Sequence, residues 1–276
     1  MNAADEQADD VCALPLVRRM AALLDRDPGQ LAEGDPLPRG WHVALFNPPT
    51  RQSHLRADGA AHLGVTLPDL GLPRLMMGGR RIEFLGDIPI GARVRRTSRP
   101  GAVTTKTGRS GRFALVDVEH RINLESGDAP VLIETTSYVL RAEEPGGQGQ
   151  SRSPAPKPPT PIPPADLSRV VAPDETMLFR YSAITDNPHR IHYDLAYARS
   201  EGYPALVVNG TVPTMLLLEM FRAHVGGEPA GWRSRNLAPI LCGGELTLTL
   251  SGEDGGWTMR AYGPSGEVAL EAKAWQ

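Results

Sequence analysis

Cysteine, aromatic side chains and long apolar runs are all scarce in this sequence. Its two cysteines, Cys12 and Cys242, lie far apart and match neither a metal-ligand spacing nor a disulfide framework, so we expect a reducing, cytoplasmic setting. No segment approaches the ~20 apolar residues of a membrane span. Residues 1–10 are acidic and lack the basic start and apolar stretch of a signal peptide. We therefore expect no association with a membrane.

A concentrated basic patch is missing as well. The chain has 29 Lys and Arg against 32 Asp and Glu, and its arginines are scattered through both halves. Because nucleic-acid binding needs a clustered basic footprint, this distribution argues against a nucleic-acid partner. The densest basic run comprises Arg93, Arg95, Arg96 and Arg99. It is most simply the solvated face of an edge strand, with a coenzyme A phosphate site as the alternative.

A proline-rich segment divides the chain into two parts. The 276 residues suit two domains of ordinary size, and 41% hydrophobic residues suffice for a core. Residues 142–166 contain eight prolines and almost no large apolar side chain, which predicts an extended linker. We therefore expect an N-terminal domain over residues 1–141 and a C-terminal domain over residues 167–276.

Each part closes with strand-like segments in which apolar and polar residues alternate, as in antiparallel strands buried on one face. The predicted strands are 80–85, 92–104, 113–124 and 131–140 in the first part, and 234–241, 245–250, 256–262 and 267–274 in the second. Both parts should thus contain a four-stranded meander, and this likeness hints at a duplication.

Two segments have helical patterns. Residues 14–24 predict an amphipathic helix, whereas residues 209–224 are apolar nearly all round and must be buried. A curved antiparallel sheet that wraps this helix would bury it. The predicted fold is therefore α+β, a double hotdog of two curved antiparallel sheets, each around a central helix. Because the first part shows no equally apolar segment, we expect its central helix to be shortened or degenerate.

One segment has the pattern of a catalytic motif. Tyr181, Ile184, Thr185, His192 and Asp194 match the motif of MaoC-like (R)-specific enoyl-CoA hydratases. Residues 187–194, Asn-Pro-His-Arg-Ile-His-Tyr-Asp, more closely resemble the type 2 3-hydroxyacyl-thioester dehydratases and mesaconyl-CoA hydratase-like proteins. Residues 37–42, 48–53 and 106–111 resemble the N-terminal domain of the same family.

The resemblance implies a hydro-lyase that reversibly hydrates a short 2-enoyl thioester, with a small dicarboxylic acyl group suggested by the closer relatives. It implies no metal and no cofactor other than the coenzyme A or phosphopantetheine of the substrate. An acyl carrier protein is the alternative carrier. A homodimer is the default expectation for a sheet with an exposed edge.

The chemistry indicates roles for two positions. Hydration next to a thioester needs a proton carrier at the reacting carbons and a donor for the enolate-like oxygen, and histidine passes protons both ways near neutral pH. We predict that His192 is the acid/base. Gly210, at the mouth of the buried helix, should offer its backbone N–H to the thioester oxygen.

Two positions depart from the family pattern. Asn187 stands where the broader motif has Asp, and Asn209 stands where members typically have His. An amide exchanges no net proton, so Asn187 can only orient water. Either His192 carries both proton steps or Asp186 is the second group, although Asp186 also fits a simple turn residue. Two alternatives stay open: a thioesterase in which Asp186 activates water, and a thioester-binding subunit with a disabled site.

Further residues are candidates for binding the substrate. They are Tyr181, Arg190, Tyr203, Asn209, Thr211, Met76, Met77 and Gly78. Arg190 is a candidate for holding a carboxylate or phosphate, whereas flexible methionines suit an adaptable acyl pocket. Trp41 and His42, in a proline-rich loop, are weaker candidates for contacting the pantetheine arm.

Overall fold

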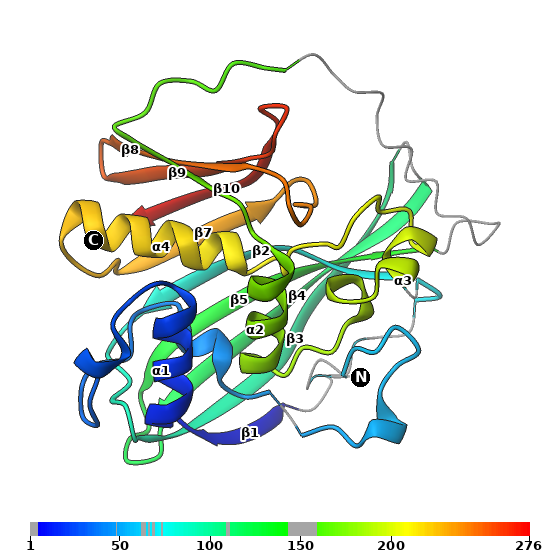
Figure 1. Cartoon of the computed structure of the whole chain (residues 1–276). Coiled ribbons are helices and arrows are strands. Elements are labelled where there is room, and N and C mark those ends of the chain that lie inside the picture. Colours follow the sequence, from blue (N-terminus) through cyan, green and yellow to red (C-terminus); the bar gives the residue numbers. More distant parts are fainter. Residues whose placement is uncertain are drawn as a thin grey trace.

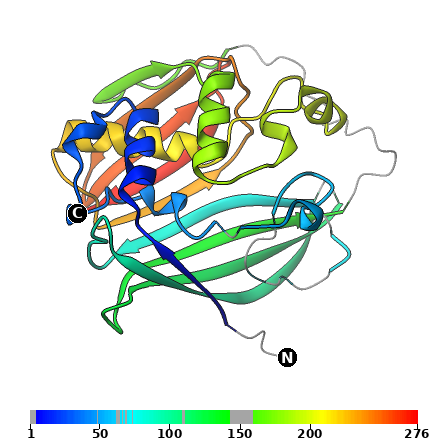
Figure 2. The ribbon, with the colours of Figure 1, turned by 60° about the horizontal axis from the view of Figure 1, so that its bottom comes forward.

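The protein is described by a computed structural model, which places residues 5–47, 49–61, 65, 67, 70–72, 74–108, 111–142 and 159–276. These residues form a ten-stranded antiparallel sheet with helices on one face (Figures 1 and 2). The strands are β1 (Glu6–Val11), β2 (Arg74–Phe84), β3 (Arg93–Gly108), β4 (Gly111–Leu124), β5 (Pro130–Arg141), β6 (Leu167–Val171), β7 (Gly231–Asn236), β8 (Leu246–Glu253), β9 (Gly256–Tyr262) and β10 (Val268–Trp275).

The sheet contains the same arrangement twice. Outward from its middle, the first half runs β2-β5-β4-β3-β1 and the second runs β7-β10-β9-β8-β6. The halves join where residues 79–83 of β2 pair antiparallel with residues 231–235 of β7. The two predicted sheets therefore form one continuous sheet, in which each half is a hotdog. The repeated strand order agrees with the duplication suggested by the sequence.

The second half wraps the helix that the sequence predicts. This helix, α4 (Val212–Val225), buries Leu217, Leu218 and Phe221 completely, and Phe221 meets Trp257 of β9 edge to face. The left-handed backbone of Gly226 ends the helix. Asn209 to Thr211 lie just before the first turn instead of within it.

The central helix of the first half is only one turn long, as expected. Where α4 stands directly before β7, the last helices before β2 among the described residues are two 3₁₀ helices, η2 (Trp41–Ala44) and η3 (Gln52–His54). Trp41 is buried and donates its indole N–H to Glu219 of α4. The backbone of Gly40 lies so close to Leu218 that a side chain would collide with it. Trp41 is therefore part of the core, and the predicted contact of this loop with pantetheine is wrong for it.

Three further helices and two strands complete the fold. The helices are α1 (Leu14–Leu23), α2 (Glu175–Ile184) and α3 (Leu195–Ser200), and α1 packs beside α2 (Figure 1). Helix α2 and the two outer strands, β1 and β6, were not predicted. Strand β7 was predicted to begin and end too late in the sequence, since the chain leaves the sheet at Asn236 and Pro239 cannot donate a ladder hydrogen bond.

The basic run in β3 is not the solvated face of an edge strand, because β1 pairs with β3 and forms the edge. Arg95 and Arg99 point outward and form ion pairs with Asp9 and Asp5, both at 2.6 Å. Arg96 points inward. Its guanidinium lies over the ring of Phe46, 5.2 Å from the centroid, and its Nε is buried without a hydrogen-bond partner among the described residues. The run therefore splits between the two faces of the sheet.

Most of the predicted linker, residues 143–158, lies outside the described residues. Residues 159–166 have no helix or strand, and the N–H of Thr160 donates to Ser265 O in the turn before β10.

Candidate active site

His192 is held as a neutral imidazole with a defined tautomer. It ends the 3₁₀ helix η4 (Arg190–His192) and is 7% exposed. Its Nδ1 lies 2.7 Å from Val207 O, and since a carbonyl only accepts, Nδ1 carries the proton. Burial lowers the pKa of His192 to about 4, although the bond to Val207 opposes this shift. At neutral pH the lone pair of Nε2 is therefore available to accept a proton.

The segment that fixes His192 also carries Gly210. Val207 is followed by Val208, whose N–H donates to Ile240 O, and then by Asn209 and Gly210. The backbone of Gly210 is exposed, whereas Asn209 and Thr211 on either side are buried. It precedes the first turn of α4, where the helix dipole favours negative charge. The hydrogen bond to Val207 O thus ties the predicted base to the segment that carries the predicted amide donor.

Asn209 has a buried acceptor that is not used. The residue is 2% exposed and its Nδ2 donates to Ser182 Oγ at 3.4 Å, but its Oδ1 has no hydrogen-bond partner among the described residues. Leaving a buried acceptor unpaired costs about 1–3 kcal/mol. A donor on a bound molecule would remove this cost. The neighbouring Thr211 hydrogen-bonds to the buried Tyr181 of α2, which places Tyr181 against the start of α4.

Asp186 and Asn187 form the turn after α2. Asp186 is exposed and has a left-handed backbone with φ of 44°, as the turn interpretation requires. The side chain of Asn187 accepts from His189 N at 3.2 Å and shapes the loop that leads to His192. The geometry therefore favours His192, and not Asp186, as the group that exchanges protons.

The first half contributes a loop beside this turn. The N–H of Arg190 donates to Asp58 O, and His189 Nε2 lies 3.9 Å from the Asp58 carboxylate. The ring of His189 in turn packs edge to face against His192, with centroids 5.6 Å apart. Asp58 of the first half thus contacts the histidine that packs against His192.

The remaining predicted binding residues occupy varied surroundings. Arg190 is paired with Asp194 at 2.8 Å and stacked on Tyr197, and its side chain is 40% exposed. Asp194 caps α3 by accepting from Tyr197 N. Tyr203 is half-buried. The acyl-wall candidates separate as well, because Met76 is exposed whereas Met77 reaches Gly210.

Met77 and Gly78 lie within β2, which begins at Arg74 and not at residue 80 as predicted. The β2–β5 pairing shifts register between Met77 and Gly79, so Gly78 sits at a bulge. The methyl group of Met77 is 3.2 Å from where a Cβ on Gly210 would lie, and its carbonyl accepts from Asn236 Nδ2. Met77 is thus the acyl-wall residue that the fold places next to the amide.

A buried polar network in the first half was not predicted. His42 Nε2 lies 2.7 Å from Glu134 Oε2, and both residues are less than a tenth exposed. Arg80 Nε lies 3.3 Å from the other carboxylate oxygen of Glu134. His42 therefore faces Glu134 inside the protein, and its predicted contact with pantetheine is wrong. These three residues are brought together by the fold and are far apart in the sequence. No local sequence pattern therefore predicts the network.

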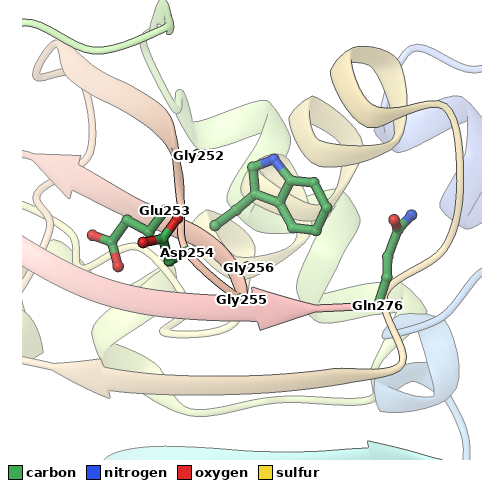
Figure 3. A pocket seen from close by; sticks show the side chains of 7 residues that line it. Gly252, Glu253, Asp254, Gly255, Gly256 and Gln276 are labelled. Atoms are coloured by element: carbon green, nitrogen blue, oxygen red, sulfur yellow. The ribbon is translucent and has the colours of Figure 1, made fainter.

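The described residues include one open depression on the surface, at the β8–β9 turn beside the C-terminal Gln276 (Figure 3). Its lining contains no predicted site residue, and its Glu253 is paired with Lys273. No group of three or more potential metal ligands is found among the described side chains. In the same part of the chain, no helix is long and apolar enough to cross a membrane.

Comparison with known proteins gives a consistent result. A family model described as hydroxyacyl-thioester dehydratase type 2 matches residues 40–242. The mesaconyl-C(4)-CoA hydratase of Chloroflexus aurantiacus is 36% identical over 271 residues, which cover 97% of this chain and 93% of the relative.

Solved structures support the same fold. HtdX of Mycobacterium tuberculosis superimposes with a TM-score of 0.69 at 19% identity, over 98% of this chain and 99% of that one. A MaoC-like dehydratase of Phytophthora capsici gives a TM-score of 0.72 at 14% identity, over 100% and 96%. By the match over most of its length, the chain belongs to the family of type 2 hydroxyacyl-thioester dehydratases.

Proposed function

We propose that this protein reversibly hydrates a short 2-enoyl thioester to the 3-hydroxyacyl thioester. The observation that carries the proposal is the neutral His192, whose Nδ1 is fixed by Val207 O on the segment that leads to the exposed Gly210. Family membership supports the same reaction class.

In the proposed reaction, Nε2 of His192 takes a proton from water while the water oxygen bonds to the β carbon. The electrons of the carbon–carbon double bond move toward the thioester oxygen, which accepts a hydrogen bond from Gly210 N–H. The proton now on Nε2 then passes to the α carbon, so one histidine serves both steps on the same face. Dehydration is the reverse sequence.

The two asparagines act as hydrogen-bonding groups in this scheme. The free Oδ1 of Asn209 would accept from the water or from an amide N–H of pantetheine. Asn187 holds the loop that positions His192. Since one imidazole supplies and removes the same proton, the reaction needs no carboxylate at residue 187 and no charge from the exposed Asp186.

The relative with 36% identity is named for a coenzyme A thioester of a dicarboxylic acid, and we propose coenzyme A and a small acyl group here too. An acyl carrier protein as carrier, a homodimer and a cytoplasmic location remain predictions. The proposed steps use only the side chains and amides of the protein and draw on no metal or redox group.

Purified protein should be assayed with crotonyl-CoA and mesaconyl-CoA, following the loss of the conjugated enoyl absorbance. We expect His192→Ala to lower kcat by about 10²–10⁴, the usual contribution of a general acid/base. The exposed His224 of α4 provides the control, since His224→Ala should leave the rate unchanged. Unchanged turnover in His192→Ala would contradict the proposed mechanism. A thiol reagent in the same cuvette separates hydration from a thioesterase, because only hydrolysis frees the thiol.

A further inference from the structure

The inner face of the first half is polar where that of the second half is apolar. The strand register aligns Glu134 of β5 with His120 of β4, and His120 with Ser98 of β3. All three side chains are buried, and His120 Nδ1 lies 2.8 Å from Ser98 Oγ. On the second half, the comparable strands bury side chains such as Leu248, Ala261 and Leu270. A charged lining needs a separate explanation, because burying charge costs free energy unless it is paired.

Glu134 is the fixed centre of this lining. One carboxylate oxygen meets His42 Nε2 at 2.7 Å, and the other accepts from Thr136 Oγ1 at 2.8 Å. Burial alone would raise the pKa of Glu134, but Arg80 and His42 outweigh it and hold the pKa well below its usual range. The carboxylate is therefore ionised, and it anchors the guanidinium of Arg80.

Arg80 links this anchor to the candidate active site, since its Nε lies near both Glu134 and Met77. Its Nε donates to Met77 Sδ at 3.2 Å, and the methyl group of Met77 in turn lies beside Gly210. This bond to sulfur is the one hydrogen bond that the Arg80 side chain donates to the described residues. Since a thioether is a weak acceptor and a guanidinium has five N–H donors, most of the binding capacity of Arg80 is unused.

The geometry points to Arg80 as the group that binds a second carboxylate at the far end of the acyl chain. With the thioester oxygen at Gly210 N–H, the acyl group would extend past Met77 toward the guanidinium. Met77 is flexible enough to move aside, and the carboxylate would replace its sulfur with a charge-assisted, two-pronged contact. The inference rests on the proposed function for the direction of the acyl chain, and it makes the first half the source of specificity.

Other arginines are less suited to this task. Arg190 is already paired with Asp194 and stacked on Tyr197. Arg96 lies on the same inner face as Arg80 and also near Glu134, but Asp10 and Glu6 on β1 lie near it too, and it stacks on Phe46 instead of contacting Met77. Arg80 has Glu134 as its ion-pair partner, and Glu134 is shared with His42.

Binding of succinyl-CoA and butyryl-CoA, measured by calorimetry, tests the inference without turnover. Both acyl chains are saturated and of equal length, and they differ in whether a carboxylate or a methyl group ends the chain. We expect the protein to bind succinyl-CoA about ten- to a hundredfold more tightly, the range for hydrogen bonds to a charged group. Arg80→Gln should abolish this preference with butyryl-CoA affinity retained, whereas Arg80→Lys should keep part of it.

Two controls protect the result. Arg81 is the next residue, its side chain is 58% exposed and it pairs with Glu83, so Arg81→Gln should retain the full preference. Arg80→Gln leaves the buried Glu134 without its cation and could therefore unfold the protein. In that case the double variant Arg80→Gln, Glu134→Gln removes both charges. The double variant should likewise bind succinyl-CoA no more tightly than butyryl-CoA.

Equal affinity for the two thioesters in the unaltered protein would overturn the inference, and so would absence of binding to both. A loss of affinity in Arg80→Gln that is the same for both thioesters would assign the network a structural role and likewise overturn it. These outcomes are distinct from failure of the proposed function. That failure would be a retained preference for succinyl-CoA in a protein that hydrates neither enoyl-CoA.

Discussion

The two halves of the molecule share one strand order but fill their inner faces in different ways. The second half wraps a four-turn apolar helix, α4, and presents the start of that helix at the candidate active site. The first half has short 3₁₀ helices before β2 and a charged network on its sheet. A duplicated sheet can thus be stabilised by an apolar core in one copy while the other copy is free to line a binding site.

The largest expected effect tests where the stability lies. Phe221→Ala in α4 should lower the free energy of unfolding by about 3–5 kcal/mol, since its ring is fully buried among apolar side chains. The matched change in the first half, Phe84→Ala, should cost less, because that ring packs against His42 and Arg39. Urea unfolding of both variants measures the difference. Equal losses would mean that the first half has as tight a core as the second.

How much of this contrast the sequence reveals depends on the range of the interactions. The apolar run of α4 and the alternating strands are local patterns, and both were predicted, with bounds close to those observed except at β2 and β7. Strand β1 was missed because Glu6–Val11 is polar and acidic, and it becomes a strand only through pairing with the arginines of β3. Helix α2 did have a signal, since Asp174 caps it and Leu178, Tyr181 and Ile184 recur at helical spacing.

The site divides in the same way. The prediction of His192 rests on the motif of residues 181–194 and that of Gly210 on its place before the apolar helix, so both rest on local patterns. The contact between His42 and Glu134 joins residues 92 positions apart, and a buried Glu in an alternating strand looks like an outward-facing one. Arg96 was placed with its neighbours on the solvated face for the same reason. Charge burial is decided by long-range pairing, which composition and periodicity do not contain.

The next effect separates the chemistry of the second half from the binding proposed for the first. Gly210→Pro removes the amide N–H and should lower kcat by about 10²–10³, as loss of one oxyanion donor does. Gly210→Ala keeps the N–H and adds a Cβ only 3.2 Å from the flexible Met77, so it should lose far less. Steady-state kinetics with crotonyl-CoA compares them. A similar loss in both variants would indicate crowding instead of a missing donor.

A smaller effect concerns pH, because each half buries a histidine whose pKa is lowered. Burial lowers the pKa of His120 in the first half and of His192 in the second to about 4, from 6.5. As pH falls from 6.5 to 4, both histidines become protonated in the unfolded chain but stay neutral in the folded protein. The free energy of unfolding therefore declines in this pH range. Each histidine should cost on the order of 2 kcal/mol near pH 4.5.

Thermal unfolding at several pH values measures this loss of stability. His120→Gln should remove the part of the loss that His120 contributes. In the same variant, the acidic limb of the kcat/KM profile should stay near pH 4, since it belongs to His192 in the second half. A limb near pH 6.5 in the unaltered protein would contradict the buried, neutral state of His192.

The smallest effect concerns the two outer strands. β1 is attached to β3 through exposed ion pairs, Arg95–Asp9 and Arg99–Asp5, whereas β6 is attached to β8 with Leu167 and Val171 packed against the core. Exposed pairs contribute only about 0.2–1 kcal/mol each and are screened by salt. Raising the salt concentration should therefore speed amide hydrogen exchange in β1 a few-fold and leave β6 unchanged, and Arg95→Gln should reproduce part of the change at low salt. If both strands responded alike, β1 would be held by its backbone ladder, and the acidic start of the chain would have no role in closing the first half.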